Sequence, residues 1–136
     1  MPSTDRRRDV LDSLGRAIVT GEMMPGQSLT LEAIQSRYGV SRTLARDCVH
    51  TLESVGIVAS RRRVGIVVLP REHWSALAPE LVRWQLEADP HGPKLGALTE
   101  LRAAIEPVAA AAAARRATEE QRSGLLALAA AIRAKG

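Results

Sequence analysis

Aromatic side chains are nearly absent from this chain of 136 residues: it has no phenylalanine, and only 2% of its residues are aromatic. A thick aromatic core is therefore excluded, and the core has to be built from alanine, leucine, valine and isoleucine. Side chains of this size favour closely packed helices. With 46% hydrophobic and 25% charged residues, the composition is that of a globular protein rather than a disordered tail.

Cysteine is also scarce, since Cys48 is the only one. A single thiol excludes an intrachain disulfide framework and a metal site built from several thiolates, and it suits a reducing cytoplasm. Cys48 falls at an apolar helix position, where we expect a small buried packing residue. The three histidines, His50, His73 and His91, lack the spacing of a ligand set, so we expect no complete metal site and no cofactor.

Long apolar runs and catalytic patterns are missing too. No segment approaches the length needed to span a bilayer, and the charged start lacks the apolar core of a secretory signal, so we expect a cytoplasmic protein without membrane contact. No Ser/His/Asp or Cys/His arrangement is evident, and no phosphate-cradling glycine loop precedes a helix. We therefore expect that the chain is not an enzyme.

The stretch from residue 29 to residue 52 carries the clearest functional pattern. It predicts two helices joined by a tight turn at Gly39-Val40, with Ser41 placed to cap the second helix. Apolar residues that should face inward recur at helical spacing: Leu44, Cys48, Val49, Leu52 and Val55. Another face of the same helix carries Arg42, Arg46 and His50 at i, i+4 and i+8. A basic, exposed helix that follows a scaffold helix is typical of DNA recognition in the major groove.

A scaffold helix is expected over residues 10–19, and three arginines precede its apolar stripe: Arg6, Arg7 and Arg8. They are either a solvated charged end or a basic arm that contacts DNA phosphates, and both interpretations stay open.

A β-hairpin is predicted after the basic helix, with strands at residues 57–60 and 66–69. The residues at its tip include Arg61, Arg62, Arg63 and Gly65. A two-stranded hairpin is marginal alone, so it should pack on the helices and project its tip as a wing. Arginines on a wing suit the narrow, negative minor groove, although a solvated charged turn is the alternative.

Three amphipathic helices are predicted in the second half, at residues 74–87, at residues 95–116 and from Thr118 to Ile132. Trp74 and Trp84 are expected to share a core-facing edge of the first of them, and Pro107 is a candidate kink in the second. Three apolar stripes need more partners than residues 71–136 supply. We therefore expect an incomplete bundle that dimerises, is completed by another chain or is unstable.

The expected fold is mostly α-helical and has two parts. Residues 6–70 form a winged helix-turn-helix DNA-binding domain with three helices and a two-stranded wing. Residues 71–136 form a partial all-α effector or dimerisation domain.

The order of these features resembles the GntR family of bacterial transcription regulators, and within it the FadR-like subfamily. The residues that carry the resemblance in the first half are Ile18, Gly21, Pro25-Gly26, Leu29, 38–43, Arg46, Leu52, 56–58 and 63–68. Those in the second half are 98–102, 105–107 and 114–118. The second half looks like the opening helices of the FadR-type effector domain, cut short.

The resemblance implies a homodimer that reads a palindromic operator in double-stranded DNA. It implies base and phosphate contacts by Arg42, Thr43 and Arg46, and a minor-groove approach at Gly65. The predicted set of DNA-contacting residues is completed by Ser41, Arg8, Arg61, Arg62 and Arg63. Relatives also hold a divalent metal and a small carboxylate metabolite in later helices, so we expect no complete effector pocket here. Arg102 is a pocket residue by resemblance, or else a surface ion-pair residue.

We thus expect a sequence-specific DNA-binding transcriptional regulator, of a kind that responds to a metabolite in its full-length relatives. The alternative is a dimerisation or protein-interaction module whose basic helix is only a solvated face.

Overall fold

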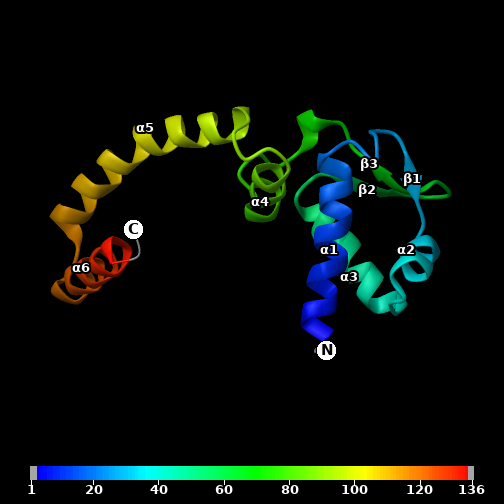
Figure 1. The fold of residues 1–136 in the computed structure, drawn as a ribbon, viewed down its shortest axis with the longest axis horizontal. Coiled ribbons are helices and arrows are strands. Elements are labelled where there is room, and N and C mark those ends of the chain that lie inside the picture. The colour runs from blue at the N-terminus through cyan, green and yellow to red at the C-terminus, as the bar shows by residue number, and fades with distance from the viewer. Residues whose placement is uncertain (1–2, 135–136) are drawn as a thin grey trace. The chain divides into compact units, whose positions relative to one another are not determined.

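The computed structural model describes residues 3–134 and divides the chain into two compact units, Met1–Leu95 and Gly96–Gly136. The fold is mostly helical, with a small antiparallel sheet in the first unit (Figure 1). The helices are α1 (Ser3–Val19), α2 (Leu31–Tyr38), α3 (Arg42–Ser54), α4 (Pro79–Ala88), α5 (Pro93–Arg116) and α6 (Glu119–Arg133), with a 3-10 turn η1 (Arg71–His73). The strands are β1 (Ser28–Leu29), β2 (Val58–Arg61) and β3 (Gly65–Val68). No helix in the described range is long and apolar enough to cross a membrane.

One apolar core lies in the first unit. Helix α1 and helix α3 each contribute a stripe of residues spaced three or four apart, and the sheet covers the stripes with the inward residues of β2 and β3. The largest fully enclosed side chains are Trp84, Ile34, Leu52, Ile57 and Leu81. Every buried hydrophobic residue of the described chain lies at or before Trp84, so the first unit holds the whole core.

Three strands form the sheet, in the order β1-β3-β2. Strands β2 and β3 make the predicted hairpin, in which Val58 lies opposite Val68. The short β1 pairs with the other edge of β3 and places Leu29 opposite Ile66. The sequence predicts only two strands, because the two residues of β1 are too few to show an alternating pattern. This added strand ties the hairpin to the start of α2.

Helix α4 packs on α1 and therefore belongs to the first compact unit. Asp12 of α1 is 9% exposed; it accepts hydrogen bonds from Nη1 of Arg83 at 3.0 Å, from Nη2 of Arg83, and from Nε1 of Trp84 at 2.9 Å. The Trp84 ring lies against Gly15, where a Cβ atom would come within 2.5 Å of the ring. The sequence division at residues 70/71 assigns this helix to the second half, whereas its packing attaches it to the first.

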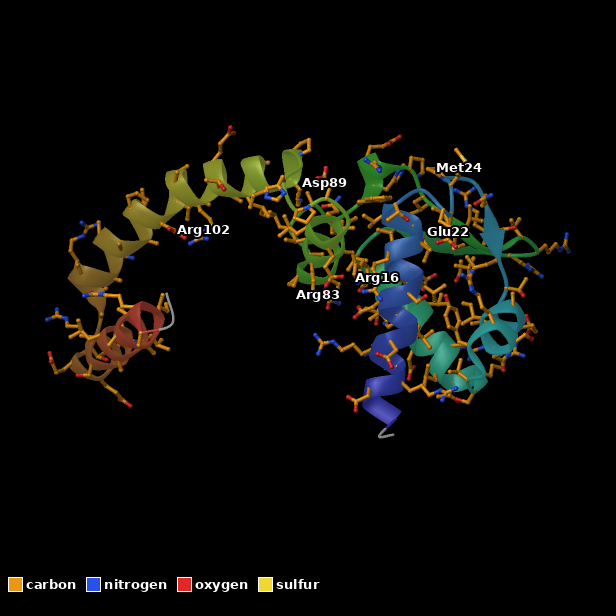
Figure 2. The ribbon with its side chains drawn as sticks, in the orientation of Figure 1. Arg16, Glu22, Met24, Arg83, Asp89 and Arg102 are labelled. Atoms are coloured by element: carbon orange, nitrogen blue, oxygen red, sulfur yellow. The ribbon has the colours of Figure 1, made fainter. Side chains whose placement is uncertain are left out.

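Charged residues extend this contact at the surface of the two helices. The Arg16 guanidinium of α1 lies 3.2 Å from the Glu87 carboxylate of α4, and Arg83 lies 3.2 Å from the same carboxylate. The labelled Arg16 and Arg83 side chains lie where α1 and α4 meet (Figure 2). The interface thus combines a part-buried ion pair, Asp12–Arg83, with exposed pairs to Glu87.

The prediction that one helix carries both tryptophans is wrong. Trp74 follows η1 in an extended conformation, and α4 begins only at Pro79. Proline is well suited to the first position of a helix, where its missing N–H would have no partner. Both side chains are nevertheless buried in the core, at 9% exposure for Trp74 and 0% for Trp84. Nε1 of Trp74 donates to the Leu69 carbonyl at 3.0 Å.

The second unit has helices without a core. Helix α5 continues through Pro107, and Thr118 and Gln121 form a capping box that begins α6. No residue from 96 to 134 is buried. The large apolar side chains that remain exposed are Leu101, Ile105, Val108, Leu125, Leu126, Leu128 and Ile132.

Candidate nucleic-acid interface

Two helices and the turn between them form a helix-turn-helix. Helix α2 ends at Gly39, whose φ of 60° lies in the left-handed region that favours glycine. Ser41 caps α3, since its Oγ accepts a hydrogen bond from the N–H of Leu44 at 3.2 Å. The residues of α3 that are buried are Ala45, Cys48, Val49 and Leu52. Leu44, which the sequence predicts to face inward, is only half-buried, and Ala45 lies in the core instead.

The opposite face of α3 is open to solvent. Its exposed residues are Arg42, Thr43, Arg46, Asp47 and His50, with Ser41 beside them at the N-cap. Arg46 has no hydrogen bond or ion pair within the described part of the chain. Arg42 does have a partner: its Nη1 lies 3.2 Å from Oε1 of Glu32, in the first turn of α2. The structure therefore places both arginines on one surface, with one guanidinium free and the other held.

Two of the three N-terminal arginines have structural roles that the sequence did not indicate. Nη2 of Arg6 donates to the carbonyl of Tyr38 at 3.1 Å and to that of Gly39 at 3.3 Å, so it caps the C-terminus of α2. Nη2 of Arg7 donates to Oγ1 of Thr51 at 2.8 Å and joins α1 to α3. Arg8 is exposed and has no partner among the described residues. Of the three, Arg8 is the one that remains available to a phosphate.

The hairpin between β2 and β3 presents its arginines to solvent. Arg61, Arg62 and Arg63 are all exposed, and the turn closes with a hydrogen bond from the N–H of Val64 to the Arg61 carbonyl at 3.1 Å. Arg63 has a φ of 65°, a left-handed conformation that is costly for a residue with a Cβ atom. A cationic side chain thus occupies a position at which glycine would be easier to accommodate.

The fold requires glycine at position 65. Its φ is 99°, and a Cβ atom at this position would lie 2.8 Å from the carbonyl oxygen of Leu29 in β1. The close pairing of β3 with β1 therefore requires glycine here, whether or not DNA approaches the wing.

Two acidic residues near this surface were missed by sequence reasoning. Glu53 of α3 accepts a hydrogen bond from the N–H of Ser60 at 2.8 Å, which fixes β2 against α3. Glu32 forms the pair with Arg42. Spacing along one helix could not reveal either contact, because each joins two different elements.

Cys48 and the histidines behave as packing or surface residues. Cys48 is fully buried, and burial raises the pKa of its thiol, while the nearby Arg7 charge acts in the opposite direction. His50, His73 and His91 are exposed. No group of three or more metal-ligating side chains occurs among the described residues.

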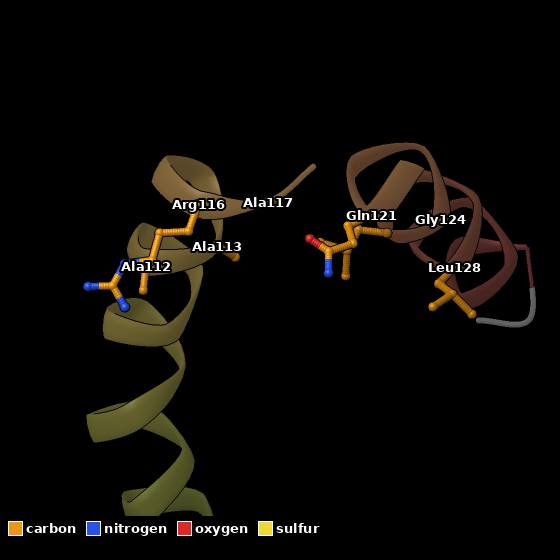
Figure 3. A pocket seen from close by; sticks show the side chains of 8 residues that line it. Ala112, Ala113, Arg116, Ala117, Gln121, Gly124 and Leu128 are labelled. Carbon is orange, nitrogen blue, oxygen red and sulfur yellow. The ribbon is translucent and has the colours of Figure 1, made fainter. Parts of the chain in front are cut away.

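Arg102 lies on an exposed turn of α5, and its Nε donates to Oε1 of Glu106 at 2.6 Å. This is the surface ion pair that the sequence left as an alternative to a pocket role. Figure 3 shows the groove between α5 and α6, which is lined by alanine and leucine together with Arg116 and Gln121. Arg102 does not line this groove.

A helix-turn-helix with an exposed basic second helix and an arginine-tipped hairpin defines the winged helix-turn-helix class of DNA-binding domain. Residues 6–68 match the family described as "Bacterial regulatory proteins, gntR family". The chain is therefore similar to this family over the DNA-binding segment. The family is one of regulatory proteins, which supports the expectation that the chain is not an enzyme.

Two relatives from Escherichia coli (strain K12) extend the similarity beyond this segment. The HTH-type transcriptional regulator YieP is 34% identical over 120 residues, which is 88% of this chain and 52% of YieP. The galactonate operon transcriptional repressor is 34% identical over 116 residues, which is 85% of this chain and 49% of the repressor. The chain thus spans about half the length of the curated relatives it matches.

Among solved structures, the chain is similar to S. agalactiae BusR in complex with its busAB-promotor DNA. The TM-score is 0.49 at 14% identity, over 96% of this chain and 57% of the BusR chain.

Proposed function

We propose that the chain is a DNA-binding transcriptional regulator that reads a specific operator, with α3 in the major groove and the β2–β3 hairpin beside it. The observation that carries the proposal is the open face of α3, where the unpaired Arg46 lies one turn after Arg42 and Thr43. An arginine that forks onto guanine O6 and N7 discriminates by about 1–3 kcal/mol, so Arg42 and Arg46 are assigned to base readout. Ser41 and Thr43 are assigned to contacts beside them.

The remaining cations are assigned to the DNA backbone and the minor groove. Arg8 and the wing residues Arg61, Arg62 and Arg63 are exposed, and their charges suit phosphates or a narrow minor groove. Arg6 and Arg7 are left out of this set, because their guanidinium groups already bind other parts of the fold.

We further propose that residues 6–70 form the DNA-binding part and that residues 71–136 belong to a dimerisation part of the FadR-like type. The exposed apolar side chains of α5 and α6 support self-association, and a homodimer would read a palindromic operator in the cytoplasm. Repression is the favoured sign of regulation, since one relative is named a repressor. The family resemblance implies response to a small carboxylate metabolite in full-length relatives, and Arg102, which pairs with Glu106, gives such a response no support here.

Selection of bound duplexes from a random pool tests this proposal. The expected result is an enriched palindrome with half-sites about 10 base pairs apart or a multiple of this, as two recognition helices of a dimer require. An enriched single half-site would contradict the dimer, and failure to retain any duplex at low salt would contradict DNA binding itself.

A further inference from the structure

Glu32 is a carboxylate at the edge of the surface assigned to DNA. It lies in the first turn of α2, and its Oε1 is 3.2 Å from Nη1 of Arg42, the first residue of α3. Both side chains are open to solvent, at 64% exposure for Glu32 and 61% for Arg42. A negative charge at this place opposes the approach of phosphates, so the general attraction of the protein for DNA does not explain it.

The geometry of the pair leaves part of the Arg42 guanidinium unoccupied. A guanidinium group has five N–H donors in a rigid planar fork. Oε1 of Glu32 lies at ion-pair distance from Nη1 alone, and Nε and Nη2 have no partner within the described residues. The edge formed by Nε and Nη2 can therefore donate to a base while the pair with Glu32 stays intact.

We propose that Glu32 is a positioning residue that sets the specificity of DNA binding through Arg42. Its carboxylate attracts Nη1 of Arg42, so that the Nε–Nη2 edge of the guanidinium faces a base. The same attraction keeps the Arg42 guanidinium away from the backbone phosphates. The inference rests on the proposed DNA-binding function and names a determinant of it.

Non-specific and specific DNA binding require different contacts from the Arg42–Glu32 pair. Non-specific binding depends on phosphate contacts, and Arg42 can reach a phosphate with its full charge only by leaving Glu32. The released carboxylate then lies unpaired next to the phosphates. Specific binding uses the free edge on a base, so the pair persists. Glu32 therefore weakens non-specific binding more than specific binding.

The test compares Glu32→Gln with a matched control, Glu22→Gln. Glu22 also pairs with an arginine, Arg37, at 3.5 Å, and the two side chains are 63% and 57% exposed. Both substitutions remove one negative charge from an exposed ion pair in the same unit. Affinities are measured by fluorescence anisotropy over a range of salt concentrations, for the duplex selected by the wild-type chain and for a shuffled duplex of the same composition.

For Glu32→Gln we expect binding to the shuffled duplex to tighten by about twofold to fivefold, which is the scale of one exposed ion pair. Binding to the selected duplex should change by less, so the ratio of the two affinities falls. The slope of log affinity against log salt for the shuffled duplex should steepen by about 0.9, the value for one additional phosphate contact. Glu22→Gln should leave the affinity ratio unchanged.

Arg42→Ala provides an internal check, because without the guanidinium Glu32→Gln should no longer alter the ratio. Equal tightening on both duplexes, or the same fall in the ratio for Glu22→Gln, would overturn the inference and leave the proposed function standing. A wild-type chain that binds neither duplex at low salt would overturn the proposed function and the inference together.

Discussion

At the scale of single residues, Arg63 carries a positive charge on a residue whose backbone conformation is unfavourable. Its φ of 65° is a conformation that costs an L-residue with a Cβ atom about 1–2 kcal/mol. Arg63→Gly should therefore raise the free energy of unfolding by about 1 kcal/mol while it weakens DNA binding. Urea unfolding and duplex titration of the same variant measure the two effects. Arg62→Gly is the matched control: it removes the same charge from a residue whose φ is not positive, and it should give no gain in stability.

Asp12 provides a prediction with a defined pH dependence. Burial by itself would raise the pKa of Asp12, but hydrogen bonds from Arg83 and Trp84 and the charges of Arg83 and Arg16 outweigh it, so the pKa lies below its ordinary value. The hydrogen bond to Asp12 likewise raises the pKa of Arg83. Because the folded pKa is the lower one, the stability from Asp12 is present above the unfolded value near 3.8 and is lost as the pH falls through the folded value.

Asp12→Asn should therefore lower the free energy of unfolding at pH 7 by about 1.5–3 kcal/mol, the worth of hydrogen bonds to a charged group. The difference between wild type and variant should shrink as the pH falls below about 4. Chemical unfolding at pH 7 and pH 3 measures it. A difference that stays constant between the two pH values would contradict the assignment of the ion pair.

Some residues of the candidate site could be predicted from sequence and others could not. The exposed position of Arg42 and Arg46 follows from helical spacing, because one periodic pattern decides both the buried and the open face of α3. The contacts of Arg6 and Arg7 could not be foreseen, since their partners lie more than 30 residues along the chain. Glu32 was missed because its partner, Arg42, belongs to another helix, so the spacing within one helix does not show the pair.

At the scale of elements, the attachment of α4 to α1 depends on the absence of a side chain at Gly15. A Cβ atom there would lie 2.5 Å from three atoms of the Trp84 ring, so Gly15→Ala should displace α4 and lower the free energy of unfolding by about 1–3 kcal/mol, as overpacking does. Gly124→Ala in α6, where nothing lies within 4 Å, should instead be neutral or slightly stabilising. Equal melting temperatures for Gly15→Ala and wild type would contradict the close packing of the Trp84 ring on Gly15.

Helix α4 also begins later in the chain than the apolar pattern of the sequence predicts. The apolar spacing from Trp74 to Leu86 is compatible with one long helix, yet Pro79 begins the helix and the residues before it form η1 and a turn. Burial of both tryptophans explains the misleading pattern, because an extended residue and a helical residue can face the same core. The strand β1 was missed because its stability comes from pairing with β3, which a local pattern does not contain.

At the scale of the whole molecule, every fully buried apolar side chain among the described residues lies in the first unit. A fragment ending at Leu95 should therefore unfold cooperatively, with a melting temperature close to that of the full chain. The full chain should bind a hydrophobic dye or self-associate through α5 and α6, and the fragment should lose this property. Calorimetry and light scattering measure the two outcomes. A fragment that melts well below the full chain would show that residues 96–136 stabilise the core.

The central claim is that the open face of α3 reads DNA sequence. The most direct measurement is the affinity of the Arg42→Ala, Arg46→Ala double variant for the duplex selected by the wild-type chain. Arg122→Ala with Arg133→Ala is the control, because it removes the same charge from α6. We expect the α3 variant to lose at least about 2 kcal/mol, roughly thirtyfold in affinity, on the selected duplex and much less on a shuffled one. Unchanged binding of the selected duplex by the α3 variant, or an equal loss in the α6 variant, would contradict the claim.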